Sequence, residues 1–206
     1  MSVVLIISAP SGSGKSTLAR RLIDSDPKLD FSTSVTTRQP RPGDEAGKSY
    51  RFVSEEEFLA MRDRDELLEW AEVFGNYYGT STEVLEQARE SGHDLLLDID
   101  VHGAGQLKER LSEAVTVFIL PPSREELEKR LRKRSSDSND VIERRLGEAA
   151  REVENYAEYN YVLVNDRLDE TLEQLRSILV GERCRQRQMA DRIESILETF
   201  QVGTKI

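Results

Sequence analysis

Residues 3–17 constrain the fold of this chain more than any other stretch of the sequence. An apolar run at residues 3–7 is followed by a loop of small residues and then by a helix-forming segment that opens at Ser16. Gly12 and Gly14 carry no Cβ, so the loop can turn tightly and point successive backbone N–H groups at one anion. The helix adds its unpaired amides and the positive end of its dipole. This order predicts a site for the phosphates of a nucleoside triphosphate.

The loop fits the phosphate-binding pattern G-x-x-x-x-G-K-[ST] except at its first glycine. Gly14, Lys15 and Ser16 match the pattern, whereas Ala9 stands where the first glycine is expected. Lys15 can reach the β- and γ-phosphates, and the Ser16 hydroxyl can bind Mg²⁺. An inert Gly/Ser-rich turn has a similar composition, but here the flanking strand and helix stand where phosphate binding needs them. The loop alone does not identify a second substrate.

The composition favours a soluble globular protein. The chain has 206 residues, of which 37% are hydrophobic and 33% charged, which suits one α/β domain with inserted subdomains. We find no apolar run that could span a bilayer and no secretory signal. Cys184 is the single cysteine, which excludes a disulfide framework and a cysteine-based metal site. We therefore expect a cytoplasmic protein without a membrane partner.

The net charge of −10 argues against binding to nucleic acid. Basic residues are nevertheless concentrated in one short stretch, as a protein that handles phosphate locally requires. They are Lys129, Arg130, Arg132, Lys133, Arg134, Arg144, Arg145 and Arg151. Only two histidines are present, which argues against a histidine-based triad or a multi-histidine metal site.

Strand and helix patterns alternate along the chain, which predicts an α/β fold with a parallel sheet covered on both faces. The expected strands are residues 3–7, 31–37, 50–53, 67–74, 94–100, 115–120 and 161–164, with an amphipathic helix as the alternative for 67–74. The expected helices are residues 16–22, 54–63, 82–91, 103–111, 123–134, 141–159 and 168–200, the last as one helix or two abutting ones. Two of them open with a capping box, Ser54 with Glu57 and Ser123 with Glu126. We expect residues 75–81 to form a turn.

Two stretches depart from the alternation, and we expect them to form lobes on a P-loop core. Residues 34–81 carry short strands that predict a small antiparallel lobe for a nucleoside monophosphate. Residues 124–156 predict a helical lid that closes over the donor. The core would then comprise residues 1–33, 82–123 and 157–206. This is the plan of a phosphotransferase.

Arginines and tyrosines of the predicted antiparallel lobe suit a phosphate group. Arg38 and Arg41 stand three apart on a loop stiffened by prolines, so they can hold a phosphate bidentately, and the hydroxyls of Tyr50 and Tyr78 can complete the cage. A solvated basic loop is the alternative. For most basic residues of the predicted lid, the alternative to phosphate binding is a solvated helix face on which Glu and Arg form ion pairs at i,i+4.

Three acidic residues stand in otherwise apolar stretches, namely Glu69, Asp98 and Asp100. Buried carboxylates need partners. Asp98, at the end of a core strand, suits Mg²⁺. A carboxylate can also accept the adjacent N1–H and N2–H₂ donors of guanine, whereas adenine presents an acceptor at that edge. For Glu69 a surface position on an amphipathic element is an equal alternative.

These residues together resemble guanylate kinase over residues 2–185. The motifs that carry the resemblance are SAPSGSGKST (8–17), SVTTRQPRPG (34–43), FGNYYGT (74–80), LDID (97–100), ILPPS (119–123) and VND (164–166). The second and third are far more specific than the P-loop. The resemblance implies the reaction ATP + GMP ⇌ ADP + GDP, with Mg²⁺ and without a covalent intermediate.

The resemblance also implies a role for individual positions. ATP would be bound by Ala9, Pro10, Ser11, Gly12, Ser13, Gly14, Lys15, Ser16, Thr17, Arg130 and Asn165, the last near the adenine. The GMP phosphate would be held by Arg38, Arg41, Tyr50 and Tyr78. Guanine would be contacted by Ser34, Glu69, Thr80 and Asp100. Asp98 would lie near the acceptor, the phosphates and, with Ser16, the metal. The catalytic residues would be Lys15, Arg38, Arg134 and Arg145.

Some positions differ from the family pattern. Besides Ala9, these are Asp44 for Glu, Thr80 for Ser, His102 for Gln, and Lys133 and Ser135 where glycines are common in the lid. Two other interpretations stay open. One is a non-catalytic scaffold module of the same fold, against which the intact Lys15 and Ser16 argue. The other is a small kinase for a phosphorylated sugar, against which Glu69 argues. An oligomer is compatible with the sequence.

Overall fold

The computed structural model describes residues 2–40, 50–73, 75–134 and 138–201. Its main sheet has the strand order β2-β7-β1-β8-β9, and every neighbouring pair in it is parallel. The strands are β1 (Val4–Ser8), β2 (Leu29–Phe31), β7 (Asp94–Asp98), β8 (Val115–Leu120) and β9 (Tyr161–Val164). The predicted α/β class with a parallel sheet is therefore confirmed.

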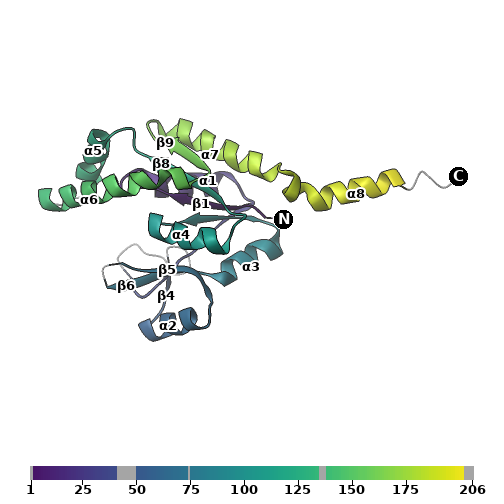
Figure 1. Ribbon diagram of the computed structural model, residues 1–206, viewed down its shortest axis with the longest axis horizontal. Coiled ribbons are helices and arrows are strands. Elements are labelled where there is room, and N and C mark those ends of the chain that lie inside the picture. Colours follow the sequence, from purple (N-terminus) through teal and green to yellow (C-terminus); the bar gives the residue numbers. More distant parts are fainter. Residues whose placement is uncertain (1, 41–49, 74, 135–137, 202–206) are drawn as a thin grey trace.

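Helices cover both faces of the main sheet (Figure 1). The helices α1 (Lys15–Ser25) and α7 (Leu168–Arg183) bury Leu22 and Leu175 against one face, and α3 (Thr82–Ser91) and α4 (Val101–Arg110) bury Leu85 and Leu107 against the other. Successive side chains of a strand point to opposite faces. In β1, Leu5 and Ile7 accordingly join the first cluster and Ile6 joins the second.

A second, smaller sheet lies beside α4 in the order β4-β3-β6-β5. It comprises β3 (Val35–Thr36), β4 (Arg51–Phe52), β5 (Leu67–Val73) and β6 (Asn76–Ser81), and helix α2 (Glu55–Asp63) packs on it through Phe58 and Met61. The α2 capping prediction is confirmed, because the Ser54 hydroxyl accepts from the Glu57 amide at 3.0 Å. This sheet and α2 form the lower part of Figure 1.

The structure corrects three predictions in this region. Residues 31–37 are not one strand, because β2 ends in the main sheet and β3 begins in the second. Residues 75–81 are mostly a strand: Gly75, with φ +73°, lies in the turn, and β6 begins at Asn76 and pairs with β5. The lobe is not purely antiparallel, because β3 and β4 run parallel. Strand propensity marked the extended residues but not where the chain changes sheets.

The helical segments after β8 also differ in detail from prediction. The helices are α5 (Arg124–Arg134) and α6 (Asn139–Glu152), and the expected helix at 141–159 ends with the 3₁₀ segment η1 (Val153–Glu158). Leu127 and Leu131 of α5 pack against Ile142 and Leu146 of α6 in a small core of their own. Ser123 caps α5 as predicted, accepting from the Glu126 amide at 3.2 Å.

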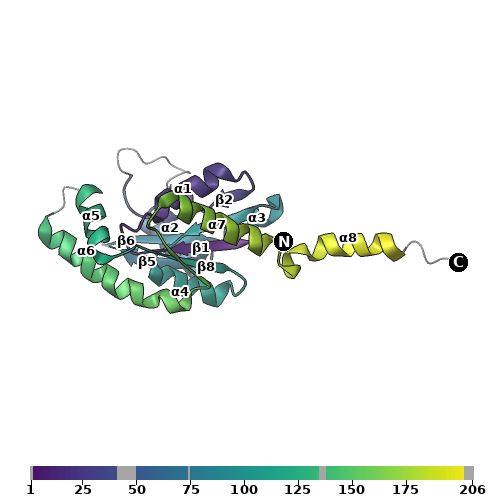
Figure 2. The ribbon, with the colours of Figure 1, turned by 90° about the horizontal axis from the view of Figure 1, so that it is seen from above.

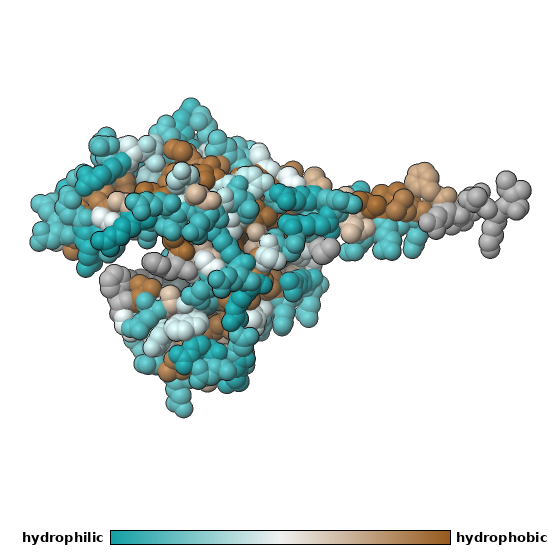
Figure 3. Space-filling view, in the orientation of Figure 1, coloured by the Kyte–Doolittle hydropathy of each residue, from teal (hydrophilic) through white to brown (hydrophobic). Residues whose placement is uncertain are grey.

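The C-terminal segment forms two helices rather than one. After α7 come the short 3₁₀ segment η2 (Gln186–Met189) and α8 (Ala190–Gln201), which projects away from the rest of the molecule (Figures 1 and 2). Leu197 and Phe200 on α8 are exposed, and an apolar stripe runs along this helix in Figure 3. Among the described helices, none combines the length and apolarity that a membrane crossing requires.

One acidic side chain ties the start of the main sheet to its last helix. The Asp94 carboxylate accepts the Val3 amide at 2.6 Å and pairs with the Arg183 Nε, also at 2.6 Å. Arg183 extends a second nitrogen to Asp26 at 2.7 Å. Burial raises the pKa of Asp26, but the hydrogen bonds from Arg183 and the Lys28 amide, together with the positive charge of Arg183, outweigh it, so the pKa is lowered overall.

Candidate active site

The phosphate-binding loop follows β1, the central strand of the main sheet. Gly12 and Gly14 both have φ +93°, a left-handed conformation that other residues adopt only with strain. The Ser13 amide closes a turn on the Pro10 carbonyl at 3.1 Å, and Gly14 is the N-cap of α1. The loop therefore presents its backbone at the N-terminus of a helix, as an anion site requires.

Both glycines are also needed because neighbouring groups approach the loop from behind. A Cβ on Gly14 would lie 2.4 Å from the Asn165 Nδ2, which donates to the Ser13 carbonyl at 2.7 Å. A Cβ on Gly12 would lie 2.9 Å from Leu131 of α5. Asn165, which follows β9, is only 4% exposed. The side chain thus braces the loop, and its expected contact with adenine stays a prediction.

A cavity of about 580 Å³ lies in front of the loop. Its lining residues are Ala9, Pro10, Ser11, Gly12, Gly14, Lys15, Ser16, Thr17, Asp100, Arg130 and Glu152. We call it the donor cavity. It holds nearly all the predicted ATP-binding residues, and Ser13 is buried beneath them. Glu152, at the end of α6, was not expected here, and nothing in the local sequence singles it out.

A second cavity of about 380 Å³ lies between the two sheets, and we call it the acceptor cavity. Its lining residues are Lys15, Ser16, Ser34, Tyr50, Glu69, Ala71, Val73, Tyr78, Gly79, Asp98, Ile99 and Asp100. Three of these, Lys15, Ser16 and Asp100, also line the donor cavity. The two cavities therefore meet at the first turn of α1.

Lys15 lies at this junction and is held by the end of β7. Its Nζ donates to the Ile99 carbonyl at 2.8 Å and forms an ion pair with the Asp98 carboxylate. Both side chains are largely buried, with exposed fractions of 18% and 15%. This contact follows from register, because Ile7 of β1 lies beside Asp98 of β7. One cation thus stands where the two cavities join.

Glu69 is the buried carboxylate of the acceptor cavity, with only 7% of the residue exposed. Its Oε1 accepts the Thr80 hydroxyl at 2.7 Å across the β5–β6 pair. Burial, reinforced by the nearby charge of Asp100, raises the pKa of Glu69 to about 7 despite the bond from Thr80. The alternative of a surface position is therefore wrong for Glu69.

Asp100 begins α4 rather than ending β7, which stops at Asp98. Its carboxylate accepts the Gly103 amide at 2.7 Å as the N-cap of α4. A Cβ on Gly103 would lie 2.8 Å from the Glu69 Oε2, so this glycine lets α4 approach the buried carboxylate. No sequence pattern pointed to Gly103.

The aromatic residues of the acceptor cavity cluster at one end. The Tyr50 and Tyr78 rings meet edge to face with centroids 6.0 Å apart. The Arg38 guanidinium lies 5.1 Å from the centroid of Tyr50 and donates to the Gln39 carbonyl at 2.9 Å. The structure therefore brings Arg38, Tyr50 and Tyr78 together. Arg38 contacts the Tyr50 ring, and Tyr50 lines the cavity. Arg38 itself is not among the residues that line the cavity in the described part of the chain.

Several predicted residues lie beyond what the structure describes. Arg41, Asp44 and Ser135 are outside the described residues, and so are the side chains of His102 and Arg134. Arg145 lies on α6, is half-buried, and lines neither cavity as described. Arg130 pairs with Glu126 at 3.2 Å and reaches the donor cavity.

The described residues contain no cluster of three or more His, Cys, Asp or Glu side chains that could hold a metal ion by themselves. Mg²⁺ in phosphoryl-transfer sites is usually held by one or two protein oxygens together with substrate phosphates. The Ser16 hydroxyl and the Asp98 carboxylate both line the acceptor cavity and supply oxygen donors of this kind. The site therefore fits Mg²⁺ only when phosphate is also bound.

A P-loop beside a second cavity with a buried carboxylate, on a parallel sheet, defines a P-loop phosphotransferase. The family model described as "Guanylate kinase" matches residues 1–182. The chain belongs to the guanylate kinase family.

Individual guanylate kinases align with this chain over nearly its whole length. The chain is 52% identical over 201 residues to a guanylate kinase of Geobacter metallireducens, with 98% of each protein covered. It is 48% identical over 194 residues to that of Escherichia coli K12, covering 93% of this chain and 94% of the relative. A crystal structure of guanylate kinase from Anaplasma phagocytophilum aligns with a TM-score of 0.73 and 38% identity, covering 90% and 88% of the two chains.

Proposed function

We propose that this chain transfers the γ-phosphoryl group of ATP directly to the phosphate of GMP, giving ADP and GDP. The observation that carries the proposal is the meeting of the donor and acceptor cavities at Lys15. A nucleoside triphosphate in the first and a monophosphate in the second would bring their phosphates together at that side chain. The proposal is supported by the family assignment over residues 1–182.

The donor side would act mainly by position and charge. Backbone N–H groups of the loop would hold the β- and γ-phosphates, and Lys15 would exchange its contacts with Asp98 and Ile99 for phosphate oxygens. Phosphoryl transfer relies on such positioning and charge stabilisation rather than on covalent catalysis. Ser16 and Asp98 would hold Mg²⁺, which when bound supplies positive charge at the phosphate oxygens.

The acceptor side would select guanine through Glu69. The ionised carboxylate can accept N1–H and N2–H₂ together, and the Thr80 hydroxyl keeps one of its oxygens in place. Adenine offers an acceptor at the same edge and would be repelled. Ser34 and Asp100 line the same cavity and suit further contacts with the base. Arg38, Tyr50 and Tyr78 would hold the phosphate of GMP, with Arg41.

The remaining parts of the proposal come from the family resemblance. Residues 34–81 would act as the acceptor lobe and residues 124–156 as the lid, around the core of residues 1–33, 82–123 and 157–206. Arg134 and Arg145 would approach the transferring phosphoryl group when the lid closes. We also propose a cytoplasmic location, with ATP and GMP as the partners.

An acceptor assay tests the function directly. ADP formation would be measured with ATP, Mg²⁺ and each of GMP, AMP, CMP and UMP. A site that pairs buried groups with substrate donors rejects an unmatched base by roughly 10⁴-fold, so we expect turnover with GMP alone at ordinary concentrations. Equal rates with AMP would refute the guanine assignment. No turnover with any acceptor would favour the scaffold module.

A further inference from the structure

Tyr50, which lines the acceptor cavity, directly precedes the short strand β4. β4 has only two residues and lies at the edge of the second sheet. Its flanking hydrogen bonds to the neighbouring segment run from the Arg51 amide to Ser34 at 2.9 Å and from the Val53 amide to Thr36 at 3.0 Å. Strands of globular proteins usually run for roughly 3–10 residues, so β4 is short. Side chains that anchor β4 can therefore add to the placement of Tyr50.

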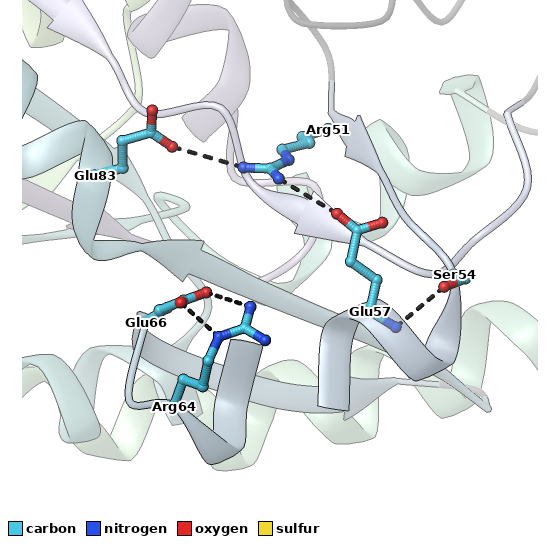
Figure 4. A network of polar contacts seen from close by, with 6 residues as sticks. All are labelled: Arg51, Ser54, Glu57, Arg64, Glu66 and Glu83. Carbon is cyan, nitrogen blue, oxygen red and sulfur yellow. Dashed lines mark hydrogen bonds and ion pairs between the residues drawn. The ribbon is translucent and has the colours of Figure 1, made fainter. Parts of the chain in front are cut away.

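Arg51 provides such support from the next position along the chain. One guanidinium nitrogen lies 3.3 Å from the Glu57 Oε1 on α2, and another lies 3.6 Å from the Glu83 Oε2 on α3 (Figure 4). Helix α2 packs on the second sheet, whereas α3 packs on the main sheet. Arg51 thus joins β4 to both layers of the molecule at once, which its planar fork of donors permits.

We propose that Arg51 is a positioning residue for the acceptor, because it fixes β4 between Glu57 and Glu83 and so holds Tyr50 against Tyr78. The proposal rests on the proposed function, in which Tyr50 binds the phosphate of GMP. It goes beyond that function because Arg51 lines neither the donor nor the acceptor cavity as described, and acts through the strand. The residue lies outside the motifs on which the family resemblance rests.

The expected effect is modest because the three side chains are about half exposed, at 47%, 48% and 59% for Arg51, Glu57 and Glu83. An exposed ion pair changes an equilibrium by a factor of about 1.5 to 5. Loss of both pairs should therefore raise the KM for GMP about three- to tenfold. The kcat and the KM for ATP should change by less than twofold.

The chain offers a matched control in the same layer. Arg64 and Glu66 form a two-bond pair at 2.6 and 2.9 Å beside the C-terminal end of α2 (Figure 4). Hydrogen bonding to Arg64 holds the pKa of Glu66 below its ordinary value, and the charge of Arg51 adds to this effect. Among the described contacts, neither side chain of this pair bonds to β4. R64A should therefore leave the KM for GMP unchanged.

The test compares R51A, R51K, E83Q and R64A by steady-state kinetics and thermal unfolding, with Y50F in parallel. We expect R51A to raise the KM for GMP. R51K should raise this KM less than R51A does, and E83Q should also raise it, by a smaller factor than R51A. If R51A only lowers the unfolding temperature and leaves the KM unchanged, Arg51 is merely structural and the proposal is wrong. An equal change in R64A would also overturn it.

Y50F separates failure of this proposal from failure of the proposed function. A raised KM in Y50F with an unchanged KM in R51A would refute the positioning role alone. An unchanged KM in Y50F would remove Tyr50 from phosphate binding, and the positioning proposal would fall with it. Absence of GMP phosphorylation by the unmodified protein would refute the proposed function itself.

Discussion

The donor and acceptor sides of the site are built in different ways. The donor loop is enclosed by buried groups: Asn165 hydrogen-bonds it from behind, and Leu127 and Leu131 pack within about 3 Å of where a Cβ on Gly12 would lie. The acceptor side has the packed core of Phe58 and Met61, but it also depends on two-residue strands, on an edge-to-face pair of rings, and on ion pairs that are about half exposed. The donor loop is fixed mainly by packing, whereas the acceptor side relies more on polar contacts near the surface.

This difference suits the two tasks. A triphosphate that is common to many reactions can be held by a preformed cradle. A monophosphate that must be selected benefits from a sheet that adjusts around it, since substrate-driven closure can add selectivity. The contrast implies that changes on the donor side should affect turnover or folding, whereas changes on the acceptor side should affect affinity.

The largest effect should follow replacement of Lys15. Lys15→Ala removes the cation at the junction of the cavities, so kcat should fall by about 10³-fold, as when a preorganised charge-stabilising group is lost. Binding of GMP, measured by calorimetry, should remain within a few-fold. If GMP binding disappeared as well, the two cavities would not be functionally separate and the comparison would fail.

A smaller effect is expected on stability, and it should distinguish Gly14 in the packed loop from Gly92, which has no close neighbour. Gly14→Ala combines a left-handed φ with an approach of 2.4 Å to Asn165, and should lower the free energy of unfolding by roughly 3 kcal/mol. Gly92→Ala shares the positive φ, at +69°, but has no neighbour within 4 Å, and should cost about 1 kcal/mol. Urea unfolding measures both. Equal losses would show that the Asn165 brace does not constrain the loop.

On the acceptor side, Glu69→Gln should change affinity and leave the fold intact. The amide oxygen can still accept from Thr80, but the amide NH₂ no longer suits the guanine donors. The KM for GMP should rise about tenfold, and discrimination against AMP should weaken. Glu72→Gln, at an exposed position of the same strand, is the control and should change neither. An unchanged preference in Glu69→Gln would remove this residue from base selection.

The pH dependence should also originate in Glu69. Because burial raises its folded pKa to about 7 from 4.5, the native state holds more protons than the unfolded state between these values. The contribution of this group to stability is therefore present below pH 4.5 and is lost as the pH rises to 7, by about 3 kcal/mol at most. The difference in unfolding free energy between the unmodified protein and Glu69→Gln measures it.

Binding of GMP should be linked to the same proton. If guanine needs the ionised carboxylate, binding at pH 6 should release a proton from Glu69, and affinity should fall about tenfold between pH 8 and pH 6. Calorimetry in two buffers of different ionisation enthalpy detects the release. Subtraction of the Glu69→Gln result removes the titration of the GMP phosphate. Identical proton release in the two proteins would contradict the role of Glu69.

The sequence predicted the parts of the fold that depend on local pattern. The strand–loop–helix at residues 3–22, the buried strand at 115–120 and the capping of α5 all follow from neighbouring residues, and the structure confirms them. The break between β2 and β3 was missed, since a run of β-forming residues carries no mark where it leaves one sheet for another.

The residues of the site also divide into those that the local sequence predicted and those that it did not. Lys15, Glu69 and Tyr78 were predicted from motifs, and the structure brings them to one cavity. Glu152 and Gly103 were missed because their places depend on how α6 and α4 approach the loop and β5. Such tertiary approaches leave no periodic signal in a single sequence. Arg51 belongs to this class as well.

The tie at Asp94 has a consequence for synthesis on the ribosome. Val3, Asp94 and Arg183 are joined by one carboxylate although they span most of the 206 residues. A nascent chain emerges from its N-terminal end, so β1 and β7 leave the exit tunnel long before Arg183 can reach them. The carboxylate and the apolar face that α7 later covers are thus exposed to chaperones in the interval between the emergence of β7 and that of α7.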